Sequence, residues 1–255
     1  MLSKQQVKYI QSLSQKKFRT SEGLFIAEGP KIVAELLSSP HIEPVALYGT
    51  ESWWQEAQPN KLSPDKQVEI SLQELEKISV QPTPHGVLGI FRQPRFSEPV
   101  QFSGKWTLVL DGIQDPGNLG TIMRTADWFG IDTVVASPDS ADVFNPKVVQ
   151  STMGSIARVQ VLYKDLHSFL EQHADKPVYA STLQGKPLIQ GEKSDPGFLV
   201  VGNESKGIRP NLLVLAKQQL TIPRIGQAES LNAAVATGIF LSQLCGATQP
   251  MGIGN

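Results

Sequence analysis

The sequence is poor in cysteine and has no long hydrophobic run, and both absences restrict what the protein can be. The single cysteine, Cys245, cannot form an internal disulfide, which favours a reducing compartment. The longest apolar runs, such as residues 106–110 and 198–201, have the length of a strand rather than of a membrane span. Residues 1–17 also lack the apolar core of a signal peptide. We therefore expect a cytoplasmic protein with no membrane partner.

Several catalytic and phosphate-binding signatures are also missing. The chain contains no GxGxxG dinucleotide fingerprint, no P-loop, no GxSxG elbow and no HExxH pair. Its four histidines, at positions 41, 85, 167 and 173, do not have the spacing of metal ligands. These absences disfavour a generic nucleotide-binding α/β enzyme, and we expect no metal ion.

The overall charge is nearly balanced, but the amino terminus is basic. A hydrophobic fraction of 40%, a charged fraction of 18% and a net charge of −1 are those of an ordinary globular protein. Residues 1–19 nevertheless contain no acidic residue. Such a cluster can neutralise phosphates of a nucleic acid, or it can be no more than a solvated helix face. Its cations are Lys4, Lys8, Lys16, Lys17 and Arg19.

Strands and helices alternate along both halves of the chain, which predicts an α/β protein. Between the halves, residues 93–104 hold two prolines and a glycine and show no helical or strand pattern. We therefore predict an amino-terminal domain over residues 1–93, a linker over 94–104, a second domain over 105–249 and a loose tail over 250–255.

The first half shows an amphipathic helix over residues 3–15 and a capping box in which Glu74 follows Ser71 by three positions. In the second half, near-continuous apolar strands are followed by helices, which is typical of a parallel sheet covered on both faces. The predicted strands of this half are KWTLVLDG, DTVVAS, ARVQVLY, PVYAS, GFLVVGNE and QQLTIPR, and its long helices are NLGTIMRTADWFG and SLNAAVATGIFLSQL.

Three segments gather polar and glycine residues where predicted strands end, which is where open α/β sheets bind ligands. In residues 108–130, a turn leads into a helix that carries Asn118 and, six residues later, Arg124. The alternative interpretation is that Asn118 only caps this helix and that Arg124 pairs with Asp127 or Asp132 on the surface.

The second segment, residues 198–208, ends a buried strand with Gly202 and continues through Glu204 and Gly207. Glycines let a backbone approach a ligand closely, although GxExxG alone is a weak signal. In the third segment, residues 220–240, Ser230 is a good N-cap for the last helix. Asn232 in the first turn is harder to explain structurally, because asparagine has poor helix propensity.

Together and in this order, the segments resemble the three motifs of the SpoU (TrmH-like) family of RNA ribose 2′-O-methyltransferases. The matching strings are DGIQDPGNLGTIMRTA, VVGNESKGI and IPRIGQAESLNAAVATGI. NPKVVQSTMGSIARV is similar to the family segment between the first two motifs. KKFRTSEGLFIAEGPKIVAELL and TPHGVLGIF resemble the RNA-binding substrate domain that many members carry. The resemblance therefore covers nearly the whole chain.

The resemblance implies an α/β fold in which a carboxyl-terminal SPOUT domain has a parallel sheet and a deep trefoil knot. It also implies a small amino-terminal, ribosomal L30e-like α/β domain that binds substrate, a homodimer, and S-adenosyl-L-methionine as cofactor. The implied reaction is methyl transfer to a ribose 2′-hydroxyl of structured RNA, with ribosomal RNA favoured over transfer RNA.

Residue by residue, the resemblance assigns two sets of side chains and backbone groups. The cofactor would contact Thr182, Gly202, Ile222 and Leu231. The catalytic set would be Asn118, Arg124, Glu204, Ser230 and Asn232.

Arg124 has the central chemical role in this assignment. Family proposals make this arginine the base that takes the hydroxyl proton, but a guanidinium is effectively always protonated in proteins. We therefore expect Arg124 to hold a phosphate and the hydroxyl in line and to stabilise the developing alkoxide. For RNA binding we predict that Lys16, Lys17 and Arg19 contact phosphates.

Two other functions remain compatible with the sequence. One is a knotted methyltransferase that acts on a base, although the pattern of Asn118, Arg124, Ser230 and Asn232 speaks against it. The other is a non-catalytic RNA-binding or assembly factor that kept the fold, since a fold alone does not guarantee activity.

Overall fold

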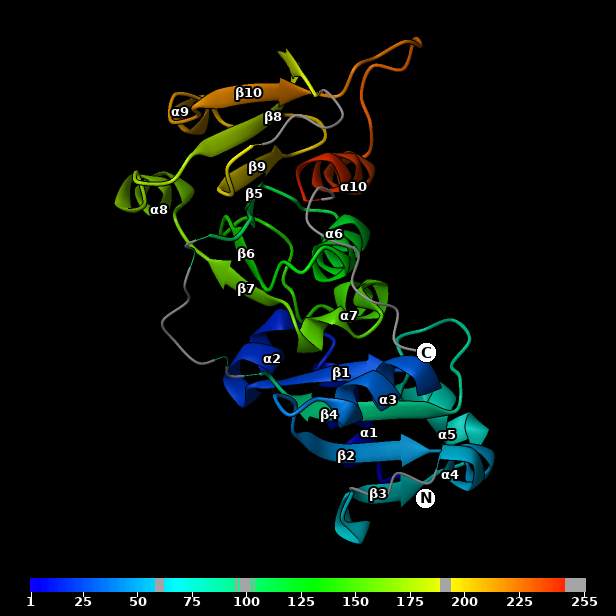
Figure 1. Cartoon of the computed structure of the whole chain (residues 1–255). Coiled ribbons are helices and arrows are strands. Elements are labelled where there is room, and N and C mark those ends of the chain that lie inside the picture. The colour runs from blue at the N-terminus through cyan, green and yellow to red at the C-terminus, as the bar shows by residue number, and fades with distance from the viewer. Residues whose placement is uncertain (58–61, 95, 97–101, 103, 189–193, 246–255) are drawn as a thin grey trace, which may run out of the picture. The chain divides into compact units, whose positions relative to one another are not determined.

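The computed structural model (Figure 1) describes residues 1–57, 62–94, 96, 102, 104–188 and 194–245. By their contacts the residues form two compact units. The first comprises Met1–Ser97 and Asp142–Arg158, and the second comprises Glu98–Ala141 and Val159–Asn255. The predicted tail lies outside the described residues, and so does most of the predicted linker.

The first unit contains a four-stranded sheet in the order β1-β4-β2-β3. Strand β4 pairs antiparallel with β1 and with β2, whereas β3 pairs parallel with β2. The strands are β1 (Leu24–Glu28), β2 (Pro44–Gly49), β3 (Gln67–Glu69) and β4 (Val87–Arg92), and the helices are α1 (Lys4–Ser12), α2 (Lys16–Glu22), α3 (Pro30–Ser38), α4 (Glu51–Ala57) and α5 (Leu72–Ile78).

Local sequence signals explain where two of these helices begin. The predicted capping box is present at α5, where the Ser71 side chain accepts from the Glu74 amide and Glu74 accepts from the Ser71 amide. Ser3 and Gln6 form a second capping box at α1. Apolar side chains of α1 and α5 then pack on one face of the sheet in a single buried cluster that includes Ile10, Leu13, Ile26, Leu75, Leu88 and Ile90.

Residues 142–158 belong to the first unit, although the sequence predicts them within the second domain, residues 105–249. The ring of Phe144 lies 5.3 Å from the ring of Phe25 on β1, between centroids. Arg158 donates to the Glu35 carboxylate at 2.9 Å. The segment carries helix α7 (Pro146–Thr152), whose Val148 and Val149 are buried. An α/β unit interrupted in sequence therefore completes its packing with a distant segment.

The second unit contains a six-stranded sheet in the order β10-β8-β9-β5-β6-β7. Every neighbouring pair in this sheet is parallel, which confirms the predicted fold class of an α/β protein with a parallel sheet. The strands are β5 (Thr107–Asp111), β6 (Thr133–Ala136), β7 (Gln160–Tyr163), β8 (Val178–Pro187), β9 (Phe198–Gly202) and β10 (Gln218–Thr221).

Helices cover both faces of this sheet (Figure 1). On one face lie α6 (Pro116–Trp128) and α10 (Ala233–Leu244), which pack side by side. On the other lie α8 (Leu166–Gln172) and α9 (Pro210–Leu213), whose side chains pack with Val109, Phe198 and Val200 in one buried cluster. Within the described part of the chain, no helix is long and apolar enough to cross a membrane.

The strand order reverses between β5 and β9. From β5 the chain proceeds through β6 to β7 on one side, while β9, β8 and β10 lie on the other side. Open α/β sheets bind ligands at the carboxyl ends of their strands at such a reversal. The carboxyl ends of β5 and β9 are Asp111 and Gly202, which pair in register.

Candidate active site

The first motif places Asn118 in the opening turn of α6, but Asn118 does not cap the helix. Asp115 is the N-cap, and its Oδ1 accepts from the Asn118 amide at 2.8 Å. The Asn118 side chain is thereby left available for other contacts. The capping interpretation of Asn118 is wrong, because the helix begins two residues earlier, at Pro116.

The second motif forms a tight loop after β9 that Asn203 closes. The Asn203 amide donates to the Gly207 carbonyl at 3.2 Å, and the Gly207 amide donates back at 2.8 Å. Asn203 Oδ1 accepts from the amides of Ser205 and Lys206, while its Nδ2 donates to the Gly112 carbonyl after β5 at 2.8 Å. This loop holds Glu204 at the carboxyl end of β9.

Gly202 is required by the fold of that loop itself. A Cβ at Gly202 would lie 2.4 Å from the carbonyl carbon of Gly207 and 2.5 Å from the amide nitrogen of Ile208. Gly207 has φ = +68°, a left-handed conformation that glycine adopts without strain. The backbone of the loop therefore requires both glycines of GxExxG, whether or not a ligand approaches them as the sequence suggested.

The third motif ends in helix α10, whose N-cap is Asn232. Its Oδ1 accepts from the amides of Ala234 at 3.0 Å and Val235 at 3.3 Å. The prediction that Ser230 is the N-cap is therefore wrong, because α10 begins at Ala233, three residues later. Capping also accounts for an asparagine here, since asparagine is among the best N-cap residues despite its poor propensity inside helices.

Side chains from all three motifs meet in one hydrogen-bonded chain. Asn232 Nδ2 donates to Asn118 Oδ1 at 2.9 Å, and Asn118 Nδ2 donates to the Glu204 carboxylate. Asn118 thus joins the starts of α6 and α10 to the loop after β9. A carboxylate and two amides placed in this way can orient a polar substrate group or a cation.

The structure leaves Arg124 and Ser230 without polar side-chain contacts among the described residues. Arg124 is exposed on α6, and the surface pair proposed with Asp132 is not formed, because Asp132 pairs with Lys105 at 2.6 Å. Ser230 is exposed in the loop before α10. The charge of Arg124 is therefore available to a ligand.

The residues assigned to the cofactor lie on β8, β9 and the loop after β10. Thr182 on β8 has a buried hydroxyl with no hydrogen-bond partner among the described residues. An unpaired buried hydroxyl is costly and suits a site that receives a polar ligand. Ile222 is half-buried and Leu231 is 45% exposed. These residues fit a ligand with a polar and an apolar part, as S-adenosyl-L-methionine has.

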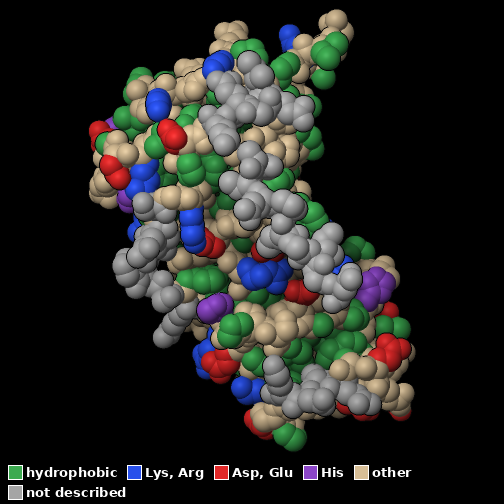
Figure 2. All heavy atoms as spheres, viewed as in Figure 1, with side chains coloured by type: hydrophobic (Ala, Val, Ile, Leu, Met, Phe, Trp, Pro, Cys, Tyr) green, Lys and Arg blue, Asp and Glu red, His purple; other side chains and the backbone are tan. Residues whose placement is uncertain are grey.

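The loop of residues 222–232, drawn in orange in Figure 1, is exposed over most of its length. Ile225 in this loop is fully exposed. Figure 2 shows hydrophobic and basic side chains together at the projecting end of this unit.

Two carboxylates and an arginine form a cluster next to the loop after β9: Asp111, Asp139 and Arg209. Asp111 is 1% exposed, and its Oδ2 accepts from the Arg209 amide at 2.7 Å. The Arg209 guanidinium lies 3.2 Å from Asp111 Oδ1 and 2.5 Å from Asp139 Oδ2. Burial raises the pKa of Asp111, whereas the Ser137 hydroxyl and Arg209 lower the pKa of Asp139. Sequence patterning did not single out any of these three residues.

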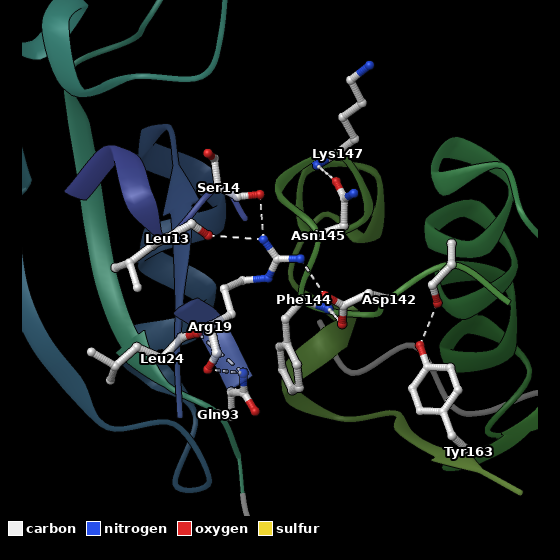
Figure 3. Close-up of polar contacts among 11 residues, drawn as sticks. Leu13, Ser14, Arg19, Leu24, Gln93, Asp142, Phe144, Asn145, Lys147 and Tyr163 are labelled. Carbon is white, nitrogen blue, oxygen red and sulfur yellow. Dashed lines mark hydrogen bonds and ion pairs between the residues drawn. The ribbon is translucent and has the colours of Figure 1, made fainter. Parts of the chain in front are cut away.

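The two lysines predicted to bind RNA are exposed on α2 in the first unit, but Arg19 is not. Its side chain is 3% exposed and donates to the carbonyls of Leu13 at 3.0 Å and Ser14 at 2.6 Å (Figure 3). It also pairs with the Asp142 carboxylate. The phosphate contact predicted for Arg19 does not agree with this geometry, because a buried and paired guanidinium is not accessible to RNA.

Comparison with known proteins shows which family the chain belongs to. The sequence model of the SpoU rRNA Methylase family matches residues 105–242, more than half of the chain and all three motifs. The chain belongs to this family. A second model, the MRM3-like substrate binding domain, matches residues 4–89. The resemblance read from the motifs is therefore confirmed.

Relatives of this SpoU-family chain align along nearly its whole length. It is 35% identical to the 23S rRNA (guanosine(2553)-2′-O)-methyltransferase RlmP of Bacillus subtilis, over 95% of this chain and 96% of that protein. The AdoMet-bound rRNA methyltransferase from Sinorhizobium meliloti is 32% identical with a TM-score of 0.82, covering 95% of each chain. A TrmH-family protein from Porphyromonas gingivalis has a TM-score of 0.84 at 39% identity, covering 97% of this chain and 100% of that one.

Among the described residues, no group of three or more histidine, cysteine, aspartate or glutamate side chains could hold a metal ion.

Proposed function

We propose that this SpoU-family protein transfers a methyl group from S-adenosyl-L-methionine to a ribose 2′-hydroxyl of RNA, and that its substrate is ribosomal RNA. The observation that carries the proposal is the hydrogen-bonded chain of Asn118, Glu204 and Asn232 at the reversal of the strand order. The names of the relatives support the choice of ribosomal RNA, and the S. meliloti structure was solved with the cofactor bound. A target inside the cell agrees with a cytoplasmic protein.

Thr182, Gly202, Ile222 and Leu231 would hold the cofactor. The unpaired hydroxyl of Thr182 is a hydrogen-bonding partner for its polar groups, and Ile222 and Leu231 supply apolar contact. When bound, S-adenosyl-L-methionine supplies an electrophilic methyl group on a sulfonium centre. The protein has to bring the ribose oxygen into line with that group and exclude water.

Arg124 positions the RNA in this proposal. Its exposed guanidinium has five donors in a fixed plane and no competing side-chain partner among the described residues, so it can bind a phosphate and the hydroxyl oxygen together. It then stabilises negative charge as the oxygen becomes the nucleophile. Asn118 and Glu204 fix the neighbouring polar surface, and Asn232 fixes the start of α10. The exposed hydroxyl of Ser230, just before α10, is available to the substrate.

Radiolabelled methyl transfer to unmodified 23S ribosomal RNA, followed by digestion to nucleosides, tests the reaction. Wild type should yield a 2′-O-methyl nucleoside, whereas Arg124→Ala should lose on the order of 100-fold or more in kcat. Arg124→Lys should remain strongly impaired, because a point charge cannot form the bidentate contact. Lys105→Ala is the control: it removes another exposed cation, located just before the amino end of β5.

Each remaining outcome of this assay counts against a specific part of the proposal. Label recovered on a base would mean that the enzyme methylates a base instead of the ribose. Full activity of Arg124→Lys would eliminate the bidentate contact. No binding of the cofactor would favour a non-catalytic RNA-binding protein.

Lys16 and Lys17 bind phosphates of the RNA in this proposal. Both are exposed at the start of α2, whereas Arg19 is left out because it is buried. Reversal of both charges to glutamate should weaken RNA binding and lower the slope of log K against log salt by about 1 to 2. Lys77→Glu, an exposed lysine on α5, is the control. Equal RNA affinity in all three proteins would eliminate this contact.

We also propose that the protein is a homodimer that uses the exposed apolar surface of α6 and α10. Trp128 at the end of α6 is 82% exposed and Val235 on α10 is 52% exposed. Exposed side chains of this size favour a covering partner. Sedimentation velocity should give twice the mass of the 27.8 kDa chain, and a monomer at micromolar concentration would refute the dimer.

The deep trefoil knot implied by the family resemblance is part of the same proposal. It is supported by the return of α10 from the edge strand β10 to pack beside α6, which follows the central strand β5. If the described fold is knotted, a chain pulled from its two ends should extend to less than its full contour length. Extension to the full length would exclude the knot.

A further inference from the structure

The loop that carries Glu204 is anchored at both of its ends to the carboxyl end of β5. At its start, Asn203 donates to the Gly112 carbonyl at 2.8 Å. At its end, the Arg209 amide donates to Asp111 Oδ2 at 2.7 Å. The backbone between these anchors closes on itself through the paired amides and carbonyls of Asn203 and Gly207. Glu204 therefore lies on a short segment whose ends are both fixed.

Charge strengthens the second anchor. Asp111 is nearly inaccessible to water, and the guanidinium of Arg209 is the cation beside it, with Nε 3.2 Å from Oδ1. The same guanidinium reaches Asp139, beyond the end of β6, at 2.5 Å. The Ser137 hydroxyl also hydrogen-bonds the Asp139 side chain, and its oxygen accepts from the Gly112 amide at 2.8 Å. Arg209 thus connects the ends of three neighbouring strands, β9, β5 and β6.

We infer that Arg209 is a positioning residue for the reaction, which it serves by holding the loop after β9 so that Glu204 faces Asn118. This inference rests on the proposed methyltransferase function. In the part of the chain that the structure describes, Arg209 bonds to Asp111 and Asp139 rather than to Asn118 or Asn232, so it acts through the loop. A buried carboxylate that loses its cation is strongly unfavourable, so the loop would shift to let water or another donor reach Asp111.

Displacement of a positioned group by about 1 Å can cost on the order of 100-fold in rate. Arg209→Gln should therefore lower kcat on unmodified 23S ribosomal RNA by roughly 10- to 100-fold. Asp139→Asn, which keeps the contact with Asp111, should lower it by less than about 10-fold.

A double-mutant cycle with Glu204→Gln separates positioning from a general loss of structure. If Arg209 acts through Glu204, Arg209→Gln should cost less than about 2-fold in kcat once Glu204 is already replaced. An equal fold-loss in both backgrounds would overturn the inference, and so would unchanged kcat in Arg209→Gln. Lys105→Gln, the loss of an exposed ion pair in the same unit, is the matched control.

Hydrogen exchange provides a readout that does not depend on activity. In Arg209→Gln the amides of residues 203–209 should exchange faster, while those of β5 keep the wild-type rate. Unchanged exchange in the loop would overturn the inference. If Arg209→Gln does not fold, Asp139→Asn provides the same cycle and the same exchange measurement at smaller amplitude. If wild type methylates no RNA, the proposed function fails, and the exchange result still decides whether Arg209 holds the loop.

Discussion

Glu28 is a single buried carboxyl group whose ionisation should oppose folding. It is 4% exposed on β1, and its carboxylate accepts from the Ser79 hydroxyl and from the Val80 amide at 3.0 Å. Burial raises the pKa of Glu28, and these two hydrogen bonds only partly offset the effect. The folded protein therefore holds the proton to a higher pH than the unfolded chain does.

The sign of the pH dependence follows from that difference. Between the pKa of Glu28 in the unfolded chain and its higher pKa in the folded protein, the unfolded chain binds fewer protons, so this group makes stability fall as pH rises. Glu28→Gln keeps an acceptor and a donor without a charge. We expect it to raise the midpoint of urea unfolding at pH 8 more than at pH 4. A gain at pH 4 equal to that at pH 8 would contradict this prediction.

Individual residues also show how far sequence reasoning reaches. Asn118, Glu204 and Asn232 come from three separate motifs, and hydrogen bonds join them in the structure. The catalytic roles that the resemblance implies for them stay a prediction. Local patterning placed the N-cap of α10 at Ser230 instead of Asn232, since both residue types cap helices well. Arg19 had no local signal of burial, because its partner Asp142 lies 123 positions away.

At the scale of secondary-structure elements, Arg19 links α2 to the segment that precedes α7. Its guanidinium is shielded from water, since the Arg19 side chain is 3% exposed and the side chain of its partner Asp142 is 16% exposed. The Gln93 side chain donates to the Arg19 carbonyl at 3.1 Å and to the Leu24 carbonyl at 3.3 Å, which holds the end of β4 to the same cluster (Figure 3). One residue therefore fixes three elements.

Loss of the buried Arg19 cation should strongly destabilise the first unit. Arg19→Met removes the cation and leaves Asp142 unpaired, which should cost about 3 to 5 kcal/mol in the free energy of unfolding. Lys16→Met, one turn earlier and exposed, should change it by less than about 0.5 kcal/mol. Urea unfolding of both variants measures the difference. Equal stabilities would show that the pair contributes nothing.

Elements with strong periodic or apolar patterns were predictable from sequence, and short ones were not. The strands of the second unit and helices α6 and α10 follow the predicted segments to within a few residues. Strand β8 extends to Pro187, beyond the predicted PVYAS, because it pairs with β10 along its later residues. Helices α2, α4, α7, α8 and α9 have four to seven residues, too few for a clear amphipathic repeat.

At the scale of the whole molecule, the discontinuous first unit makes a fragment experiment informative. A fragment of residues 98–245 keeps residues 142–158 but lacks β1 and α3, against which they pack in the first unit. We expect this segment to exchange its amide protons far faster in the fragment than in the full chain. The strands β5 and β9 should remain protected, because their packing is internal to the second unit.

The same fragment experiment has a clear contrary outcome. Full protection of residues 142–158 without residues 1–97 would mean that this segment is stable by itself. Addition of a separate fragment of residues 1–97 should restore protection if the missing contacts are the cause.

The division into two units also has a consequence for the order of synthesis. Domains generally fold from the amino terminus as the ribosome releases the chain. Here the first unit lacks part of its core until residues 142–158 have emerged, and by then β5, α6 and β6 have emerged as well. The nascent protein must therefore keep an unfinished first unit in solution while the second begins to form, so neither half can be completed before the other has started.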